Sequence, residues 1–290
     1  MKPIVILDAG HNEYVSGKEA PDKSLREWDF NNQVQYKLKK RLEKLGFEVY
    51  LTNPNPANKN EIGLHKRCDL ANNYWNKKGK PANCLFISLH ANAYGKWTSA
   101  RGVEVFIAKN ASSSSKNAAT MICKHIYNDI SKIDKGFKNR GVKVENYTVI
   151  YNTRMKCCLI EYGFYTNKSD LKLLKNNKDD FVEATIKGVC EYFKVTYVAP
   201  KKESSSSATT KETTYYRVVT NSYLDRKLAD KEVSELKKLG INAFLDAFKK
   251  DNKTYLRVVA GSYTDRKNAE TQLATLKKKG YDPFIAIYKK

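Results

Sequence analysis

Three apolar segments of this sequence end on a histidine or a glutamate, side chains that bind metals and transfer protons. They are ILDAGH, which ends at His11, LFISLH, which ends at His90, and CLIEYGF, which contains Glu161. Each segment is typical of a buried strand, and open parallel sheets bind ligands at the carboxyl ends of their strands. One such strand end alone is more simply a polar residue in a surface loop. Three of them together indicate a site at one edge of a sheet.

A third metal ligand would complete a set of two histidines and one carboxylate, which suits zinc with an open position for water. Glu27 is the best candidate, but Ser24-Leu25-Arg26-Glu27 also fits the S-x-x-E capping box, in which Glu27 only satisfies a backbone N–H at a helix start. On spacing alone the capping interpretation is favoured, and no H-E-x-x-H motif is present. Other carboxylates also compete for the ligand role, namely Asp8, Glu13, Asp22 and Asp29.

Strand and helix signals alternate through about the first 195 residues. Apolar runs predict strands at 4–7, 47–51, 84–89, 103–108, 149–151 and 158–160. Apolar residues at helical spacing predict helices ending near Leu45 and spanning 62–75, 119–133 and 182–193. This alternation predicts an α/β fold, with an open, twisted, mostly parallel sheet covered by helices on both faces.

The composition changes after this region. Residues 198–214 contain Pro200 and the run Ser204–Ser207, which predicts a flexible linker. The segment Tyr215–Lys250 then recurs 40 residues later, and each copy shows a strand, an amphipathic helix and a second strand. Two copies predict a ferredoxin-like βαββαβ domain. The predicted organisation is therefore a domain at 1–197, a linker at 198–214 and a second domain at 215–290.

The chain is strongly basic, with 53 Lys and Arg residues against 31 Asp and Glu residues and a net charge of +22. Such a charge favours a polyanionic partner, and nucleic acid and an anionic cell wall both fit. The charge is spread along the chain, which argues weakly against a dedicated nucleic-acid arm. No segment approaches the roughly 20 apolar residues that span a bilayer. The start Met1-Lys2-Pro3 shows no signal-peptide pattern, and the six cysteines form no C-x-x-C pair, so we expect cytoplasmic synthesis and reduced thiols.

Taken in order, the motifs of the first domain resemble those of the zinc-dependent N-acetylmuramoyl-L-alanine amidases of the Amidase_3 family. The matching segments are DAGH ending at His11, the helix-opening Glu27, SLHANA around His90, RGVKVENYTVI at 140–150 and EYGFYTN from Glu161. This resemblance implies that His11, Glu27 and His90 bind Zn²⁺ and that Glu161 is the catalytic carboxylate. The bond cleaved would join N-acetylmuramic acid to L-alanine in peptidoglycan. Asn12-Glu13 replaces the glycines usual after the first histidine, which would alter the neighbouring loop.

The repeat resembles a SPOR domain, a module that binds peptidoglycan glycan strands lacking stem peptides. Asn221-Ser222-Tyr223 and Gly261-Ser262-Tyr263 carry this resemblance, while Val219 stands where a polar residue is usual. Strand alternation predicts one face that carries aromatic rings and arginine donors suited to a sugar chain, namely Tyr215, Arg217, Tyr255 and Arg257. The expected partners are therefore the glycan strands and stem peptides of peptidoglycan, together with anionic wall polymers.

A wall hydrolase retained in the cytoplasm would reach its substrate only after release by lysis. A phage endolysin and an autolysin that lyses the mother cell of a sporulating bacterium both fit this expectation, and the sequence does not separate them. Two other interpretations remain open: a zinc carboxypeptidase of similar α/β build, and a non-catalytic basic protein that binds the cell wall or nucleic acid. The presence of all four proposed site residues argues against the non-catalytic protein.

Overall fold

The computed structural model describes residues 2–54, 61–200, 214–251 and 253–289. The chain divides into two compact units, Met1–Pro200 and Lys201–Lys290. Most of the predicted linker at 198–214 lies outside the described residues.

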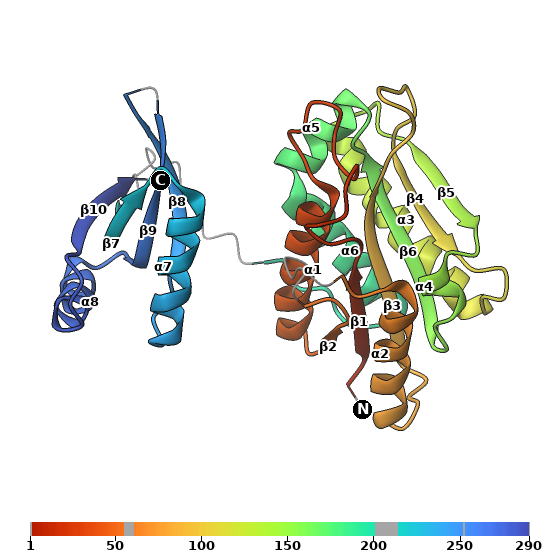
Figure 1. Ribbon diagram of the computed structural model, residues 1–290. Helices are drawn as coiled ribbons and strands as arrows, with labels where there is room; N and C mark the ends of the chain where they lie inside the picture. Colours follow the sequence, from red (N-terminus) through yellow and green to blue (C-terminus); the bar gives the residue numbers. More distant parts are fainter. Residues whose placement is uncertain (1, 55–60, 201–213, 252, 290) are drawn as a thin grey trace. The chain divides into compact units, whose positions relative to one another are not determined.

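The first unit contains a six-stranded sheet with the order β2-β1-β3-β6-β4-β5 (Figure 1). Strand β1 pairs in parallel with β2 and β3, β3 pairs in parallel with β6, and β4 pairs in parallel with β5. Only the β4–β6 pair among these is antiparallel, which confirms the predicted mostly parallel sheet. The strand bounds are Ile4–Ala9 for β1, Glu48–Leu51 for β2, Cys84–Asn92 for β3, Val103–Ile107 for β4, Asn139–Val144 for β5 and Lys156–Phe164 for β6.

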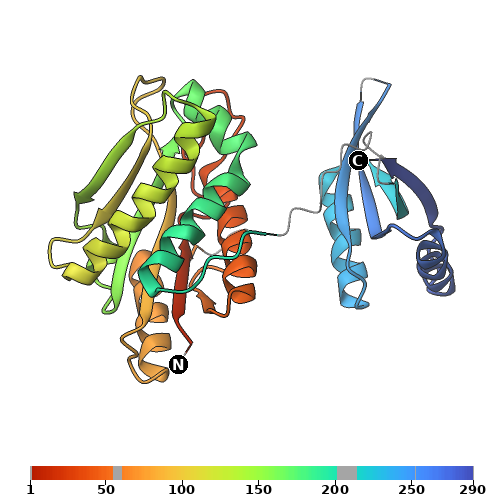
Figure 2. The same cartoon turned by 180° about the vertical axis from the view of Figure 1, so that it is seen from behind.

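Helices cover both faces of this sheet, as the sequence predicts. Helices α1 (Glu27–Lys44), α3 (Ser113–Ile133), α5 (Lys168–Asn176) and α6 (Lys178–Phe193) share one apolar core with the sheet, and Figure 2 shows α1, α3 and α6 over that face. Helices α2 (Leu64–Lys77) and α4 (Thr148–Tyr151) belong to a second core on the other face. Alternate β1 residues enter the two cores, Val5 and Leu7 on one side and Ile4 and Ile6 on the other. This is why β1 is apolar throughout.

One local prediction is wrong, and two elements were not predicted. Residues 149–151 form part of α4, a single helical turn, rather than a strand. Their apolar run is too short for its periodicity to distinguish a buried strand from a buried helical turn. Strand β5 and helix α5 were not predicted. Strand β5 is an edge strand in which only two residues, both valines, have apolar side chains, so it carries no continuous apolar run.

The second unit is a four-stranded antiparallel sheet with the order β10-β7-β9-β8. Its elements run in the predicted βαββαβ order: β7 (Thr214–Tyr223), α7 (Arg226–Lys238), β8 (Phe244–Lys250), β9 (Lys253–Tyr263), α8 (Arg266–Lys278) and β10 (Phe284–Lys289). Asp225 and Asp265 cap the two helices in the same way, each accepting a hydrogen bond from the backbone two residues on. Both helices pack on one face of the sheet, around Val218 and Val258.

All six cysteines are buried, and none of them forms a disulfide bond. In the described parts of the chain, no helix combines the length and apolar character that crossing a membrane requires.

Candidate metal and catalytic site

His11, Glu27 and His90 meet at one edge of the first sheet. His11 follows the carboxyl end of β1, Glu27 opens α1, and His90 lies near the carboxyl end of β3. The Glu27 carboxylate lies between the two rings, with Oε1 3.0 Å from His90 Nδ1 and Oε2 3.3 Å from His11 Nε2. One ligand atom from each residue lies within 4.8 Å of the other two, and no other such group occurs among the described residues. The three side chains could therefore hold one metal ion.

The structure contradicts the capping-box interpretation of Glu27. Helix α1 begins at Glu27 itself, and Arg26 occupies the N-cap position without a side-chain hydrogen bond. The Glu27 side chain is 3% exposed and also accepts hydrogen bonds from the backbone N–H of Ala91 and from Asn31 Nδ2. Burial raises the pKa of Glu27, but hydrogen bonds and charges from His11 and His90 outweigh it and lower the pKa to about 2. Glu27 is thus held in the ionised form that a metal requires.

The four competing carboxylates do not join this group. Asp8 is buried behind the site, where Oδ2 accepts from Ser88 Oγ at 2.9 Å and Oδ1 faces Arg67. Asp22 and Asp29 accept hydrogen bonds from neighbours on their own loop or helix. The ligand group leaves out all four alternatives that spacing left open: Asp8, Glu13, Asp22 and Asp29.

Glu161 lies beside this group on β6, directly opposite His90 on the paired strand β3. It lines the same cavity of about 450 Å³ as His11, Glu27 and His90. Its Oε2 atom is buried and has no hydrogen-bond partner among the described residues. Burial, followed by the negative charges of Glu27 and Glu104, raises the pKa of Glu161 well above its ordinary value. This environment favours the protonated carboxyl group, which can donate a proton to a reacting group.

Glu104 is the carboxylate on β4 that lies opposite Glu161. It is buried and pairs with Arg140 at 2.6 Å and with Lys143. Burial raises the pKa of Glu104, but these two cations outweigh it and lower the pKa below the ordinary value. Glu104 therefore stays ionised, and its charge acts on Glu161 across the strand pair. Both cations belong to the segment RGVKVENYTVI at 140–150, one of the segments that carry the family resemblance.

The backbone between β1 and His11 is tightly constrained. A Cβ atom on Gly10 would lie within 2.5 Å of three atoms of the His90 ring, so only glycine fits without displacing that ring. His11 adopts a left-handed conformation with φ of 61°, which is uncommon for a residue with a side chain. This turn directs the His11 imidazole towards Glu27 and His90.

In the second unit, the four residues predicted to contact glycan lie on the central strands β7 and β9. The Arg217 guanidinium stacks 3.5 Å from the centroid of the Tyr288 ring and pairs with Asp246 at 2.8 Å. Arg257 stacks 3.8 Å from the centroid of Phe248, and Phe248 in turn stacks on Tyr255. The register of the four strands extends this face with two exposed rings that the sequence analysis did not single out, Phe244 and Phe284.

Comparison with known proteins decides the family. Residues 5–191 match the family described as N-acetylmuramoyl-L-alanine amidase (Amidase_3). The chain belongs to this family. This amidase hydrolyses the amide bond between N-acetylmuramic acid and L-alanine in peptidoglycan. Residues 212–286 match the SPOR domain, and both domain types bind peptidoglycan.

Named relatives agree with this assignment. The chain is 30% identical to the endolysin of Bacillus phage SPP1 over 213 residues, which are 70% of this chain and 72% of the endolysin. It is 28% identical to the N-acetylmuramoyl-L-alanine amidase LytC of Bacillus subtilis over 66% of this chain, but it spans only 35% of LytC. A crystal structure of an N-acetylmuramoyl-L-alanine amidase from Clostridium difficile 630 superposes with a TM-score of 0.59 at 26% identity. It covers 68% of this chain and 99% of that one.

Several residues that line the amidase cavity were not identified from the sequence. Tyr165 is buried, and burial together with the charges of Glu27 and Glu161 raises its pKa, so its hydroxyl remains a neutral donor. Tyr165 could have been identified from the sequence, because it lies four residues after Glu161 and directly follows β6. Lys18 and the partly exposed Tyr147 also line the cavity, but loop residues of this kind carry no periodic signal.

Proposed function

We propose that the amidase holds Zn²⁺ with His11, Glu27 and His90 and that Glu161 transfers the protons of the reaction. The observation that carries this proposal is the unpartnered, buried Oε2 atom of Glu161 in the cavity that the three ligand side chains share. A buried carboxylate oxygen without a partner is costly, so a substrate or water is expected to supply its hydrogen bond.

The donor set fits zinc. Two imidazole nitrogens and one carboxylate oxygen are a common set in catalytic zinc sites, which keep a further position open. The three donors come from separate elements and already lie within 4.8 Å of one another. When bound, Zn²⁺ supplies Lewis-acid activation of water and of the scissile carbonyl group.

The protein's own residues supply the remaining chemistry. Glu161 accepts a proton from the attacking water and delivers it to the nitrogen of the departing L-alanine. Its raised pKa favours the protonated form, which is the form that delivers the proton to the nitrogen. The neutral hydroxyl of Tyr165 and the side chain of Lys18 are among the donors that line the cavity.

Substitution of Glu161 tests the catalytic assignment. Glu161→Gln keeps the size of the side chain and removes its basicity, so we expect zinc content to stay unchanged while hydrolysis of purified peptidoglycan is lost. Mass spectrometry of the digest should show, for the wild type, intact stem peptides with a free L-alanine amine. Glu43→Gln, an exposed glutamate of α1 that pairs with Lys39, is the matched control. Full activity of Glu161→Gln would refute the role.

We further propose that the open face of the SPOR domain binds glycan strands. The arginines of β7 and β9 that stack on aromatic rings of β10 and β8 support this, together with the exposed Phe244 and Phe284. Arg257→Ala in the full chain should weaken binding to glycan strands lacking stem peptides in a pull-down assay. Arg226→Ala, which removes an exposed arginine from α7, should not weaken it. Equal binding by both variants would contradict the proposal.

For the biological setting, we propose that the enzyme acts on the wall after release by lysis, as an endolysin or as a sporulation autolysin. The similarity to the SPP1 endolysin supports the first of these roles. Fractionation of bacteria that produce the protein should find it inside intact cells, and permeabilising the membrane should start wall degradation. Wall degradation without permeabilisation would contradict the proposal.

A further inference from the structure

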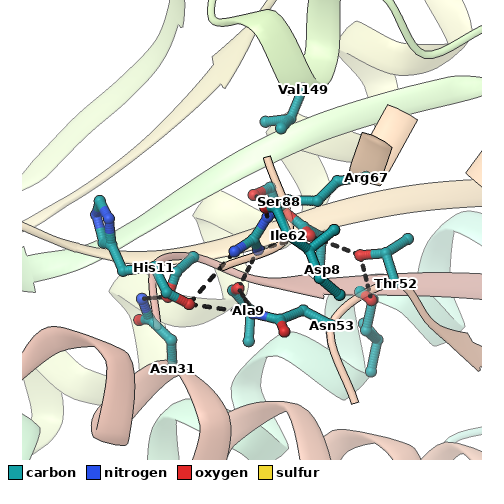
Figure 3. A network of polar contacts seen from close by, with 12 residues as sticks. Asp8, Ala9, His11, Asn31, Thr52, Asn53, Ile62, Arg67, Ser88 and Val149 are labelled. Atoms are coloured by element: carbon teal, nitrogen blue, oxygen red, sulfur yellow. Dashed lines mark hydrogen bonds and ion pairs between the residues drawn. The ribbon is translucent and has the colours of Figure 1, made fainter. Parts of the chain in front are cut away.

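Behind the metal-ligand group lies a buried ion pair between Asp8 and Arg67 (Figure 3). Both side chains are 1% exposed, and Arg67 Nη1 lies 3.0 Å from Asp8 Oδ1. Asp8 also accepts hydrogen bonds from Thr52 Oγ1 at 2.6 Å and from Ser88 Oγ at 2.9 Å. Arg67 belongs to α2, while Asp8 belongs to β1. The pair therefore ties the helix on one face of the sheet to the strand that leads to His11.

The Arg67 guanidinium also reaches backbone beyond Asp8. It donates to the carbonyl oxygen of Ala9 at 2.5 Å, to that of His11 at 3.4 Å and to that of Ile62 at 2.8 Å. Figure 3 shows the guanidinium between Asp8 and the His11 carbonyl group, with the His11 imidazole pointing away from the network. Arg67 thus contacts the backbone of a proposed metal ligand without approaching its ring.

Two amide side chains complete this set of contacts. Asn53 Nδ2 donates to the carbonyl oxygens of Ala9 and His11 at 3.0 and 3.1 Å, and Asn31 Nδ2 donates to that of Gly10 at 3.1 Å. Three consecutive carbonyl groups at the end of β1 therefore accept hydrogen bonds from buried side chains of other segments. Asn53 follows β2 and Asn31 lies in α1, so each donor comes from a different part of the fold.

We infer that Arg67 is a positioning residue that holds the left-handed turn at His11 and thereby orients its imidazole for the metal. A residue with a Cβ atom keeps this conformation only where the surrounding structure determines it, and the φ of 61° at His11 meets that description. The planar guanidinium can serve Asp8 and several carbonyl groups at once, whereas a lysine ammonium is a single point charge. This inference rests on the proposed metal site.

Zinc affinity in Arg67→Lys tests the inference. The substitution keeps the charge beside Asp8 and removes the planar fork, so we expect the zinc dissociation constant to rise about 10- to 100-fold, the range known for residues that orient metal ligands. The constant is measured by competition with a chelator on the full chain. The visible spectrum of the Co²⁺-substituted protein provides a second readout, because it reports the ligand geometry directly and should change in Arg67→Lys.

Arg41→Lys is the matched control, because Arg41 also forms an ion pair, partly buried, with Glu183, but joins α1 to α6 far along the helix from Glu27. It should bind zinc like the wild type. Asn53→Ala removes two of the same carbonyl contacts without touching the ion pair, and it should raise the dissociation constant about tenfold. This second variant keeps the test decisive if Arg67→Lys does not fold.

The results distinguish a failure of the positioning role from a failure of the proposed metal site. The positioning role would be overturned if Arg67→Lys had the zinc affinity and Co²⁺ spectrum of the wild type, even if the metal-free variant melts at a lower temperature. If Arg67→Lys does not fold, the same result in Asn53→Ala would overturn it. Equal losses in Arg41→Lys would also overturn it, since they would show general destabilisation. A wild-type chain that binds no zinc would overturn the proposed metal site, and the positioning role with it.

Discussion

Replacing Gly10 with alanine should disable the proposed metal site while leaving the fold in place. The added Cβ atom would lie within 2.5 Å of Nδ1, Nε2 and Cε1 of His90. The backbone of Gly10 cannot easily retreat, because its N–H donates to the Leu89 carbonyl group and its own carbonyl group accepts from Asn31. The His90 ring must therefore move.

The size of the effect follows from the contact distances. Non-bonded carbon atoms rest about 3.5–4.0 Å apart, so the ring must shift by at least about 1 Å. A zinc–nitrogen bond of about 2.0–2.1 Å tolerates deviations of only about 0.2 Å. We therefore expect zinc affinity to fall at least 100-fold. The rate of peptidoglycan hydrolysis should also fall, because misplacing a reacting group by about 1 Å costs about 100-fold in rate.

The assay combines zinc content after dialysis, chelator competition and hydrolysis of purified peptidoglycan. Gly63→Ala is the matched control, because a Cβ atom at Gly63 meets nothing within 4 Å and the residue has a negative φ of −58°. Thermal unfolding of the metal-free proteins checks that both variants fold. Normal zinc affinity in Gly10→Ala would show that the position of His90 does not control zinc binding. That result would contradict its proposed role as a zinc ligand.

Two further predictions concern stability and reactivity. A hydrogen bond from Arg101 lowers the pKa of Asp134 below its ordinary value of 3.8, so its stabilising effect should be present above about pH 4 and lost as the pH falls through the lowered pKa. Asp134→Asn should accordingly be less stable than the wild type by about 1 kcal/mol or less at pH 7, and this difference should shrink as the pH falls below about 4, as measured by urea denaturation; a constant difference would contradict the ion pair as its source. Burial raises the pKa of Cys123 and Cys190 to about 11, so a thiol reagent at pH 8 should leave the native chain unmodified and label six cysteines after denaturation. Rapid labelling of the native chain would contradict the buried positions.

The elements that bury apolar residues could be predicted from the sequence. Strands β1 and β3 and helices α3 and α6 carry strong apolar patterns because the sheet is covered on both faces. Strand β5 could not be predicted in this way, because its position at the sheet edge leaves its side chains partly exposed and polar. A helical turn such as α4 is defined by its tertiary contacts rather than by its own residues.

The site was predictable only where a strand end marked it. His11, His90 and Glu161 follow apolar runs, and parallel pairing brings these strand ends together. Glu27 has no such marker, and local spacing favoured a capping role that the helix start at Glu27 excludes. The role we infer for Arg67 was invisible for a further reason. A buried arginine in an amphipathic helix is indistinguishable in sequence from an exposed one until its acceptors on β1 are known.

The origin of the site residues has a consequence for the order of folding. His11 and Glu27 are near neighbours in the chain, but His90 and Glu161 reach them only through the β1–β3 and β3–β6 pairings. Pairings between segments so distant in sequence close large loops, and such contacts form slowly. A nascent chain thus offers a metal at most two of the three proposed ligands until β3 has joined the sheet, and Glu161, the proposed proton-transferring group, joins them only when β6 has paired with β3. A chain in which β3 and β6 have not yet joined the sheet therefore lacks the complete proposed centre.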